Sequence, residues 1–146
     1  MFTYTGSDIA DGVWFGIVIG QESMTNGDMI ICAIDTDGTT GCADYFGVSG
    51  SVPQTDANSN DVTLADTIST ELSVVLTVTR ALSTGDEDED VALSDGATIT
   101  YGYAYGPFSS GTFSAATTTG SVESTVGNAV YMTLTIFAIT VFGMML

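Results

Sequence analysis

The stretch that decides the fold runs from residue 29 to residue 46 and reads MIICAIDTDGTTGCADYF. Two apolar segments, residues 29–34 and 41–46, flank a turn-forming segment centred on Asp37 and Gly38. Short runs rich in β-branched and aromatic residues on either side of an Asp-Gly pair are typical of a β-hairpin. If the loop consists of residues 36–38, antiparallel pairing places Cys32 directly opposite Cys42.

The chain has two cysteines, Cys32 and Cys42. Their facing positions predict a cross-strand disulfide, which would favour an oxidising compartment. The alternative is a pair of small buried thiols on neighbouring strands, because free cysteine is among the residue types most often buried.

Further short strands are predicted on both sides of the hairpin. Residues 13–19 form a continuous apolar run that includes Trp14. We expect this run to be a buried strand, with Trp14 in the core. Residues 62–64, 71–82 and 97–105 read as three more strands, separated by Gly-, Asn- and Asp-rich turns. Without a helical period, this organisation predicts an all-β fold, an antiparallel β-sandwich over residues 1–108.

Tyr101, Tyr103 and Tyr105 alternate with small residues in the last of these strands. Side chains two residues apart lie on one face of a strand, so the three rings share a face. A one-sided row of aromatic residues usually belongs to the core, and the alternative is a face that stacks on sugars.

Composition excludes several classes of function. The chain has 146 residues, 18 of them acidic against one basic residue, Arg80, and it has no histidine. Such a charge repels a phosphate backbone, so nucleic acid is excluded as a partner. Histidine is the most frequent general base and zinc ligand, so its absence argues against most enzyme templates and we predict a protein that is not an enzyme.

The few charges inside the domain allow two binding hypotheses. Asp86, Asp88 and Asp90 alternate with glutamates and could hold calcium, but their spacing is not that of an EF-hand loop, and a solvated turn is the alternative. Arg80 could pair with an anionic ligand or with a neighbouring carboxylate.

The chain changes character after residue 108. Residues 109–128 are rich in Ser, Thr, Ala and Gly and read as a flexible stalk. Residues 129–146 carry no charge, and a helix of that length is roughly 27 Å long, close to the hydrocarbon thickness of a bilayer. We expect a single C-terminal hydrophobic helix that spans the membrane, or a cleaved glycolipid-anchor signal, and a buried helix is the weaker alternative.

The order of several motifs resembles that of a DOMON domain. The first half has Trp14-Phe15-Gly16-Ile17, then Met24 and Asn26-Gly27-Asp28, then Asp44-Tyr45-Phe46. The second half has Asp61-Val62-Thr63-Leu64, then Thr79-Arg80-Ala81-Leu82, Leu93-Ser94-Asp95-Gly96, and Tyr103-Ala104-Tyr105-Gly106. The resemblance implies an immunoglobulin-like sandwich that binds haem or a sugar outside the cytoplasm.

The resemblance also suggests where a cofactor would bind. In haem-binding DOMON domains one axial ligand is a Met after the Trp strand, and Met24 stands at that place. The alternative is that Met24 fills the core, which is the more common role of a Met near the start of a strand. The second ligand is usually a His after the last Tyr-Gly strand, whereas residues 107–113 contain none. We therefore expect no cofactor, with haem b as the alternative.

Three functions follow from these features. The leading hypothesis is a non-catalytic binding or adhesion module for a glycan or a protein partner, tethered by its C-terminal tail to the extracellular face of a membrane. The first alternative is a b-type cytochrome domain that transfers electrons. The second is a structural subunit of a membrane or filament assembly. No secretory signal follows Met1, so an extracellular protein would begin inside a longer precursor or at a processing site.

Overall fold

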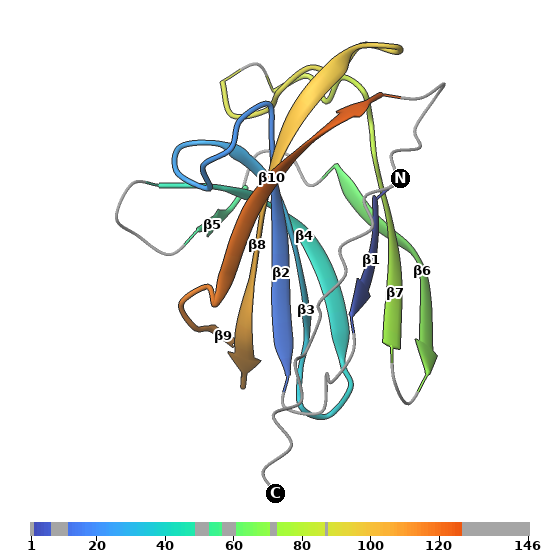
Figure 1. Cartoon of the computed structure of the whole chain (residues 1–146), viewed down its shortest axis with the longest axis vertical. Helices are drawn as coiled ribbons and strands as arrows, with labels where there is room; N and C mark the ends of the chain where they lie inside the picture. The colour runs from blue at the N-terminus through green and yellow to red at the C-terminus, as the bar shows by residue number, and fades with distance from the viewer. Residues whose placement is uncertain are drawn as a thin grey trace, which may run out of the picture.

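The computed structural model describes residues 2–6, 12–48, 53–56, 61–70, 73–86 and 88–126. These residues form ten β-strands and no helix (Figure 1). The strands are β1 (Phe2–Gly6), β2 (Val13–Ile19), β3 (Asp28–Ile34), β4 (Thr40–Phe46), β5 (Gln54–Thr55), β6 (Val62–Thr70), β7 (Ser73–Arg80), β8 (Thr98–Ser109), β9 (Thr112–Phe113) and β10 (Thr118–Thr125).

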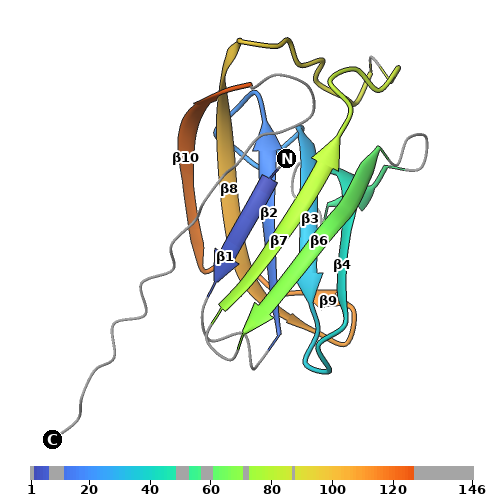
Figure 2. The same ribbon diagram turned by 90° about the vertical axis from the view of Figure 1, so that its right-hand side faces the viewer.

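The strands make two antiparallel sheets. A three-stranded sheet has the order β1-β7-β6, and a seven-stranded sheet has the order β10-β8-β2-β3-β4-β5 with β9 paired to β8. In Figure 2 the smaller sheet lies as one layer over β2, β3 and β8 of the larger one. This arrangement confirms the predicted antiparallel β-sandwich.

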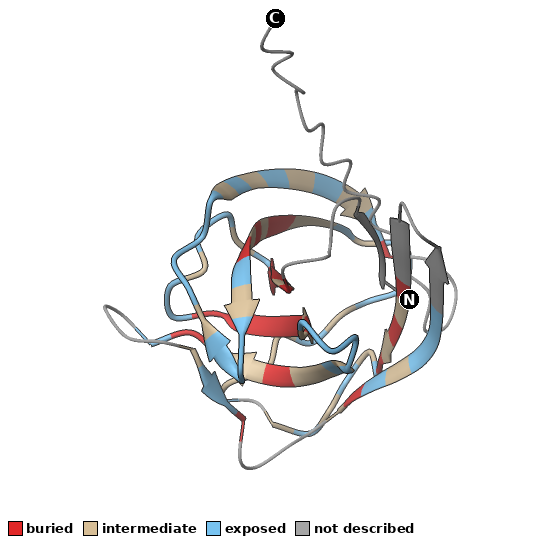
Figure 3. Ribbon diagram, turned by 90° about the horizontal axis from the view of Figure 1, so that it is seen from below, coloured by how far each residue is buried: buried red, intermediate tan, exposed pale blue. Residues whose placement is uncertain are grey.

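The main core lies between the sheets. Alternation along β2 and β3 sends Phe15, Ile17 and Ile30 into this space, where they meet Leu76 and Val78 of β7. Tyr101 is buried there too, and Tyr103 and Tyr105 pack against the same cluster, so the tyrosine face belongs to the core. Burial is concentrated at the centre of the molecule (Figure 3).

The central strands β2 and β3 are also covered on their other face. A second cluster contains Trp14, Val18, Met29, Ile31 and Ala104, all buried. Strands buried on both faces need continuous apolar runs, and this explains why residues 13–19 and 29–34 are apolar throughout. We call this covered surface the outer face of the larger sheet.

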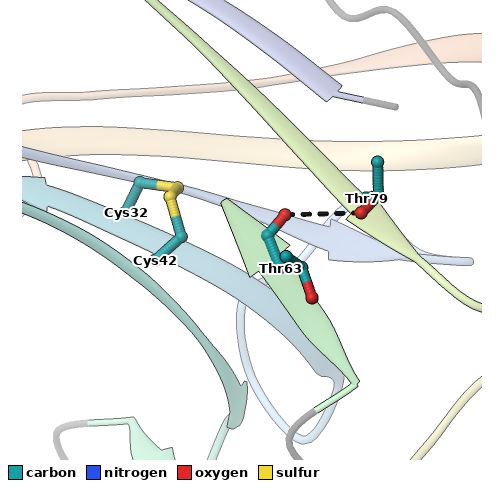
Figure 4. The surroundings of a disulfide bond; sticks show 4 residues. All are labelled: Cys32, Cys42, Thr63 and Thr79. Carbon is teal, nitrogen blue, oxygen red and sulfur yellow. Dashed lines mark hydrogen bonds between the residues drawn. A yellow bond between two sulfur atoms is a disulfide. The ribbon is translucent and has the colours of Figure 1, made fainter. Parts of the chain in front are cut away.

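The predicted hairpin and its disulfide are confirmed. The register pairs Ile34 with Thr40 and Cys32 with Cys42, and the two cysteines form a disulfide (Figure 4). The loop closes through hydrogen bonds from Asp35 N to Thr39 O and from Gly38 N to Asp35 O. Gly38 has φ +84°, a conformation that side-chain-bearing residues rarely adopt. In Figure 4 the bridge lies on β3 and β4 and is drawn beside Thr63 of β6 and Thr79 of β7.

The predicted stalk is wrong for much of its length. Residues 112–113 form β9, and β10 pairs with β8 in continuous register from Thr118–Tyr105 to Thr125–Thr98. A strand at a sheet edge is held by backbone hydrogen bonds, so a Ser/Thr-rich sequence can form it with one inward apolar side chain, here Val122. The sandwich therefore extends at least to Val126, which is buried, rather than ending at residue 108.

The predicted C-terminal helix, residues 129–146, lies outside the described residues. Among the residues that are described, no helix is long and apolar enough to cross a membrane.

Candidate functional site

A cavity of about 480 Å³ opens on the outer face of the larger sheet. Its floor consists of Trp14 from β2, Ile31 from β3 and Ala104 from β8. The walls come from three loops and two strands: the loops contribute Met24, Thr25, Gly47, Val48, Pro53, Ser114, Ala115 and Ala116, and the strands contribute Phe113 of β9 and Thr119 of β10. The site thus has an apolar floor with more polar walls, as small-molecule pockets commonly do.

Small residues on the outer face of β8 make room for this pocket. Gly102, Ala104 and Gly106 alternate with the three inward tyrosines. A Cβ atom on Gly102 would collide with the carbonyl oxygen of Glu22, and one on Gly106 would lie 2.7 Å from that of Ala115. Two loops therefore pack directly against the strand backbone, and Ala104 is left between them as the pocket floor.

Met24 lies over the pocket from the loop between β2 and β3. A Cβ atom at Gly16 would lie 3.0 Å from its Cε methyl, which means that the side chain reaches down to the sheet where β2 has no side chain. The structure thus places Met24 in the pocket wall, where it also packs against the outer cluster.

Trp14 holds the opposite wall in place. Its Nε1 donates a 2.9 Å hydrogen bond to the carbonyl oxygen of Ser114, and its ring meets Phe113 edge to face with centroids 6.0 Å apart. Phe113 also makes an edge-to-face contact with Tyr45 and lies 5.2 Å from Phe108, measured between ring centroids. The wall is therefore built on an aromatic cluster, Trp14, Tyr45, Phe108 and Phe113.

Sequence reasoning missed this wall, although the residues carried a signal for it. Ser110 and Gly111 have φ +51° and +75° and form the two-residue turn that folds Phe113 back over Phe108. Two adjacent residues with positive φ are the signature of a tight β-hairpin turn, and Ser-Gly between two phenylalanines is compatible with it.

A second group of polar residues lies on the inner face of the larger sheet. Asp28 and Asp44 face the space between the sheets, where Arg80 of β7 reaches Asp28 from the smaller sheet. Arg80 Nη2 lies 2.7 Å from Asp28 Oδ2 and 3.0 Å from Asp90 Oδ1, so the chain's one basic side chain pairs with carboxylates, one of the two predicted roles. Arg80 Nη1 donates to Val91 O, and Val91 N donates to Asp28 Oδ2.

The pKa values of Asp28 and Asp44 are both raised above the usual value for an aspartate. Burial raises the pKa of Asp28 to about 6, although the Arg80 guanidinium acts against the shift. Burial together with the neighbouring carboxylate of Asp28 raises the pKa of Asp44 to about 7. Both shifts reflect the cost of burying a carboxylate charge between the sheets.

The predicted trio Asp86, Asp88 and Asp90 does not come together. Asp90 joins Asp28 and Asp44, Asp86 lies beside Asp56 and Glu89, and Asp88 is exposed. Asp86 Oδ1 accepts hydrogen bonds from the backbone N of Asp88 and Glu89, which makes it a turn-forming residue. Asp28 and Asp44 were not predicted as a site, although an aspartate at an inward strand position is an unusual choice for a core.

The family model of the DOMON domain matches residues 5–106. The chain belongs to the DOMON domain family. The match ends at the last residue of the Tyr-Gly strand motif, and β9 and β10 continue the DOMON sandwich beyond it.

Two solved structures share the DOMON fold of this chain. One is the cytochrome domain of Myriococcum thermophilum cellobiose dehydrogenase, with a TM-score of 0.62 and 15% identity over 84% of this chain and 64% of that one. The other is the cytochrome b domain of pyranose dehydrogenase from Coprinopsis cinerea, with a TM-score of 0.59 and 15% identity over 86% of this chain and 66% of that one. The chain thus spans about two thirds of each domain. No curated protein sequence matches it.

Proposed function

We propose that the outer-face pocket is the ligand site of this DOMON domain, that its ligand is haem b, and that the domain carries single electrons. The observation that supports this most directly is the position of Met24, whose thioether side chain forms part of the wall of an apolar cavity. The two solved structures that share the fold are named as cytochrome domains, which also favours this assignment.

The residues of the pocket include one that would hold haem iron. A thioether sulfur is a known haem-iron ligand, and Met24 supplies one at the pocket. Trp14, Ile31 and Ala104 offer an apolar floor that would shield a porphyrin face from water. Bound haem would supply one-electron redox chemistry at its iron, while the chain's own part is to hold the ring, exclude water and offer the Met24 sulfur.

The chain has no histidine that would bind the iron together with Met24. The opposite wall offers the Ser114, Ala115 and Ala116 backbone and the Thr119 side chain, none of which is a common haem ligand. The Met–His pair implied by the family resemblance therefore cannot form. We infer that, among the residues that line the pocket, Met24 is the one whose side chain would bind the haem iron.

A second candidate function is a non-catalytic module that binds a glycan. The missing histidine favours it, and so does the aromatic cluster beside the pocket, because aromatic rings stack on sugar rings. The earlier expectations of a membrane tether, an extracellular location and no enzymatic activity remain part of this second proposal.

An absorption titration distinguishes the two. Adding haem to the purified chain should give a Soret band that saturates at one equivalent, with quenching of Trp14 fluorescence. Met24→Leu keeps the apolar volume and removes the sulfur, so the band should shift and the affinity should fall by roughly tenfold. The control is Thr25→Val, which changes a neighbouring wall residue without touching the sulfur.

The haem assignment fails if no Soret band saturates at one equivalent, or if Met24→Leu and Thr25→Val give the same spectrum as the parent protein. In that case, quenching of Trp14 fluorescence by oligosaccharides would support the glycan-binding candidate.

A further inference from the structure

We propose that Asp28, Asp44 and Asp90 form a calcium-binding site between the two sheets. The site is separate from the outer-face pocket, because Asp28 and Asp44 point to the inner face of the larger sheet while the pocket lies on its outer face. Asp28 begins β3, Asp44 lies near the end of β4, and Asp90 belongs to the segment between β7 and β8.

The spacing of the three carboxyl groups suits one calcium ion. One oxygen from each lies within 4.8 Å of one oxygen of both others. Calcium binds oxygen at about 2.3–2.6 Å, so two ligands on opposite sides of the ion are about 4.8 Å apart. The three oxygens are therefore close enough together to be ligands of one ion.

Asp44 provides the independent sign of a missing ligand. Its side chain is buried, with the residue only 1% exposed, and neither carboxyl oxygen has a hydrogen-bond partner among the residues that the structure describes. Buried polar atoms are nearly always paired, because an unpaired carboxylate in the interior is costly. Both oxygens of Asp44 are therefore available to a ligand, and one of them lies within 4.8 Å of a carboxyl oxygen of Asp28 and of one of Asp90.

Asp28 and Asp90 each have one carboxyl oxygen that is held by a partner and one that is available to a ligand. Asp28 Oδ2 accepts a hydrogen bond from Val91 N and forms an ion pair with Arg80, and Asp90 Oδ1 forms an ion pair with Arg80. Within the described part of the chain, Asp28 Oδ1 and Asp90 Oδ2 have no hydrogen-bond partner. Arg80 thus fixes one side of each carboxylate and leaves the other side available.

The charge of the site matches a divalent cation. Three ionised carboxylates and the Arg80 guanidinium leave two negative charges, which one Ca²⁺ would neutralise. The donors are all oxygens, which suit hard cations, and the chain has no histidine and no free cysteine to favour zinc. Magnesium requires near-ideal octahedral geometry at about 2.0–2.1 Å, whereas calcium accepts irregular sets of oxygen ligands, so three carboxyl groups held on separate segments suit calcium better.

The neighbouring acidic residues would assist binding. Asp56, Asp86 and Glu89 form a second acidic group that is more exposed, with oxygens within 4.8 Å of one another. Their negative potential would attract a cation to this end of the sandwich. The ion would join β3 and β4 to the segment that carries Asp90, and thereby stabilise the connection between the sheets.

The test uses the full chain after removal of metal with a chelator. Calorimetric titration with calcium chloride should give one site with a Kd at or below about 10⁻³ M, and calcium should raise the unfolding temperature. Magnesium at the same concentration should bind at least tenfold more weakly.

Two matched substitutions locate the site. Asp44→Asn keeps the shape of the side chain and removes one charge, so calcium affinity should fall by roughly tenfold or more. Asp88→Asn removes one charge from the exposed part of the same acidic segment and should leave affinity unchanged. If Asp44→Asn does not fold, as judged by Trp14 fluorescence, Asp90→Asn replaces it.

The proposal is overturned if calcium neither binds nor raises the unfolding temperature, if magnesium binds as tightly, or if the two substitutions have equal effects. None of these readouts depends on the outer-face pocket, so the calcium site and the haem assignment can fail independently.

Discussion

Trp14 and Ser114, 100 residues apart in the chain, are joined by a 2.9 Å hydrogen bond from the indole Nε1 to the backbone carbonyl oxygen. The bond fastens the loop between β9 and β10 to the central strand β2, and both residues line the outer-face pocket. Trp14, a buried residue of the central strand β2, therefore also positions the pocket wall.

Trp14→Phe should weaken both the packing of the core around β2 and the attachment of the pocket wall. The substitution removes the hydrogen bond and part of the buried ring, so the free energy of unfolding should fall by about 1–3 kcal/mol in urea denaturation. Ser114→Ala is the matched control, because the bond uses the main-chain carbonyl, and it should change stability by less than about 0.5 kcal/mol. Equal effects of the two substitutions would contradict the importance of this bond.

Gly106 permits the close approach of the same loop. A Cβ atom there would lie 2.7 Å from Ala115 O and 2.9 Å from Trp14 Nε1. Gly106→Ala should therefore displace the loop, lower stability by about 1–3 kcal/mol and shift Trp14 emission to the red.

Gly41→Ala is its control in another strand of the same sheet. A Cβ atom at Gly41 would meet no heavy atom of the described structure within 4 Å, so the alanine should be neutral or slightly stabilising. If both variants keep the emission of the parent protein, the loop does not depend on Gly106.

The sandwich and the hairpin could be predicted because local patterns specify them. The Asp37-Gly38 turn set the register that joined Cys32 to Cys42, and alternation alone assigned the tyrosines of β8 to the core. These features depend on residues close together in the sequence or on a simple period.

The acidic cluster and the pocket wall could not be predicted, because each joins distant segments. Asp28, Asp44 and Asp90 meet only when the sandwich has closed, and the acidic run 86–90 suggested instead that neighbours in sequence act together. The Ser/Thr-rich sequence of β10 has no apolar alternation that would predict a strand. This strand is stabilised by pairing with β8 rather than by its own side chains.

The disulfide should contribute measurably to stability. It closes a loop between residues ten positions apart, for which the chain-entropy argument gives about 2–3 kcal/mol. Unreduced protein should show no free thiol by mass spectrometry after alkylation, and a reductant should lower the free energy of unfolding by that amount. A variant with both cysteines replaced by alanine should be insensitive to the reductant.

Tyr101 should make the fold sensitive to alkaline pH. Burial raises its pKa to about 12, against 10 for an ordinary tyrosine, so the unfolded chain releases this proton more readily than the folded one. Its contribution is therefore complete below about pH 10 and is progressively lost as the pH rises towards 12. Absorbance at the tyrosinate band should show one late-titrating group that is missing from Tyr101→Phe, and that variant should lose stability less steeply over the same pH interval.

The boundary of the domain can be tested by two truncations. Val126 is buried and completes the sandwich through hydrogen bonds from its N to Ala97 O and from Gly96 N to its own carbonyl oxygen. A chain that ends at residue 128 keeps these bonds, all of β10 and the carbonyl that accepts the Trp14 hydrogen bond, so it should unfold cooperatively with Trp14 still buried. A chain that ends at residue 108, the boundary predicted from composition, loses β9, β10 and Ser114 together. It should expose the edge of β8 and the Trp14 ring, and show a red-shifted emission and a broad, weakly cooperative transition. If the shorter chain unfolds as sharply as the longer one, β10 is dispensable and the composition-based boundary is the correct one.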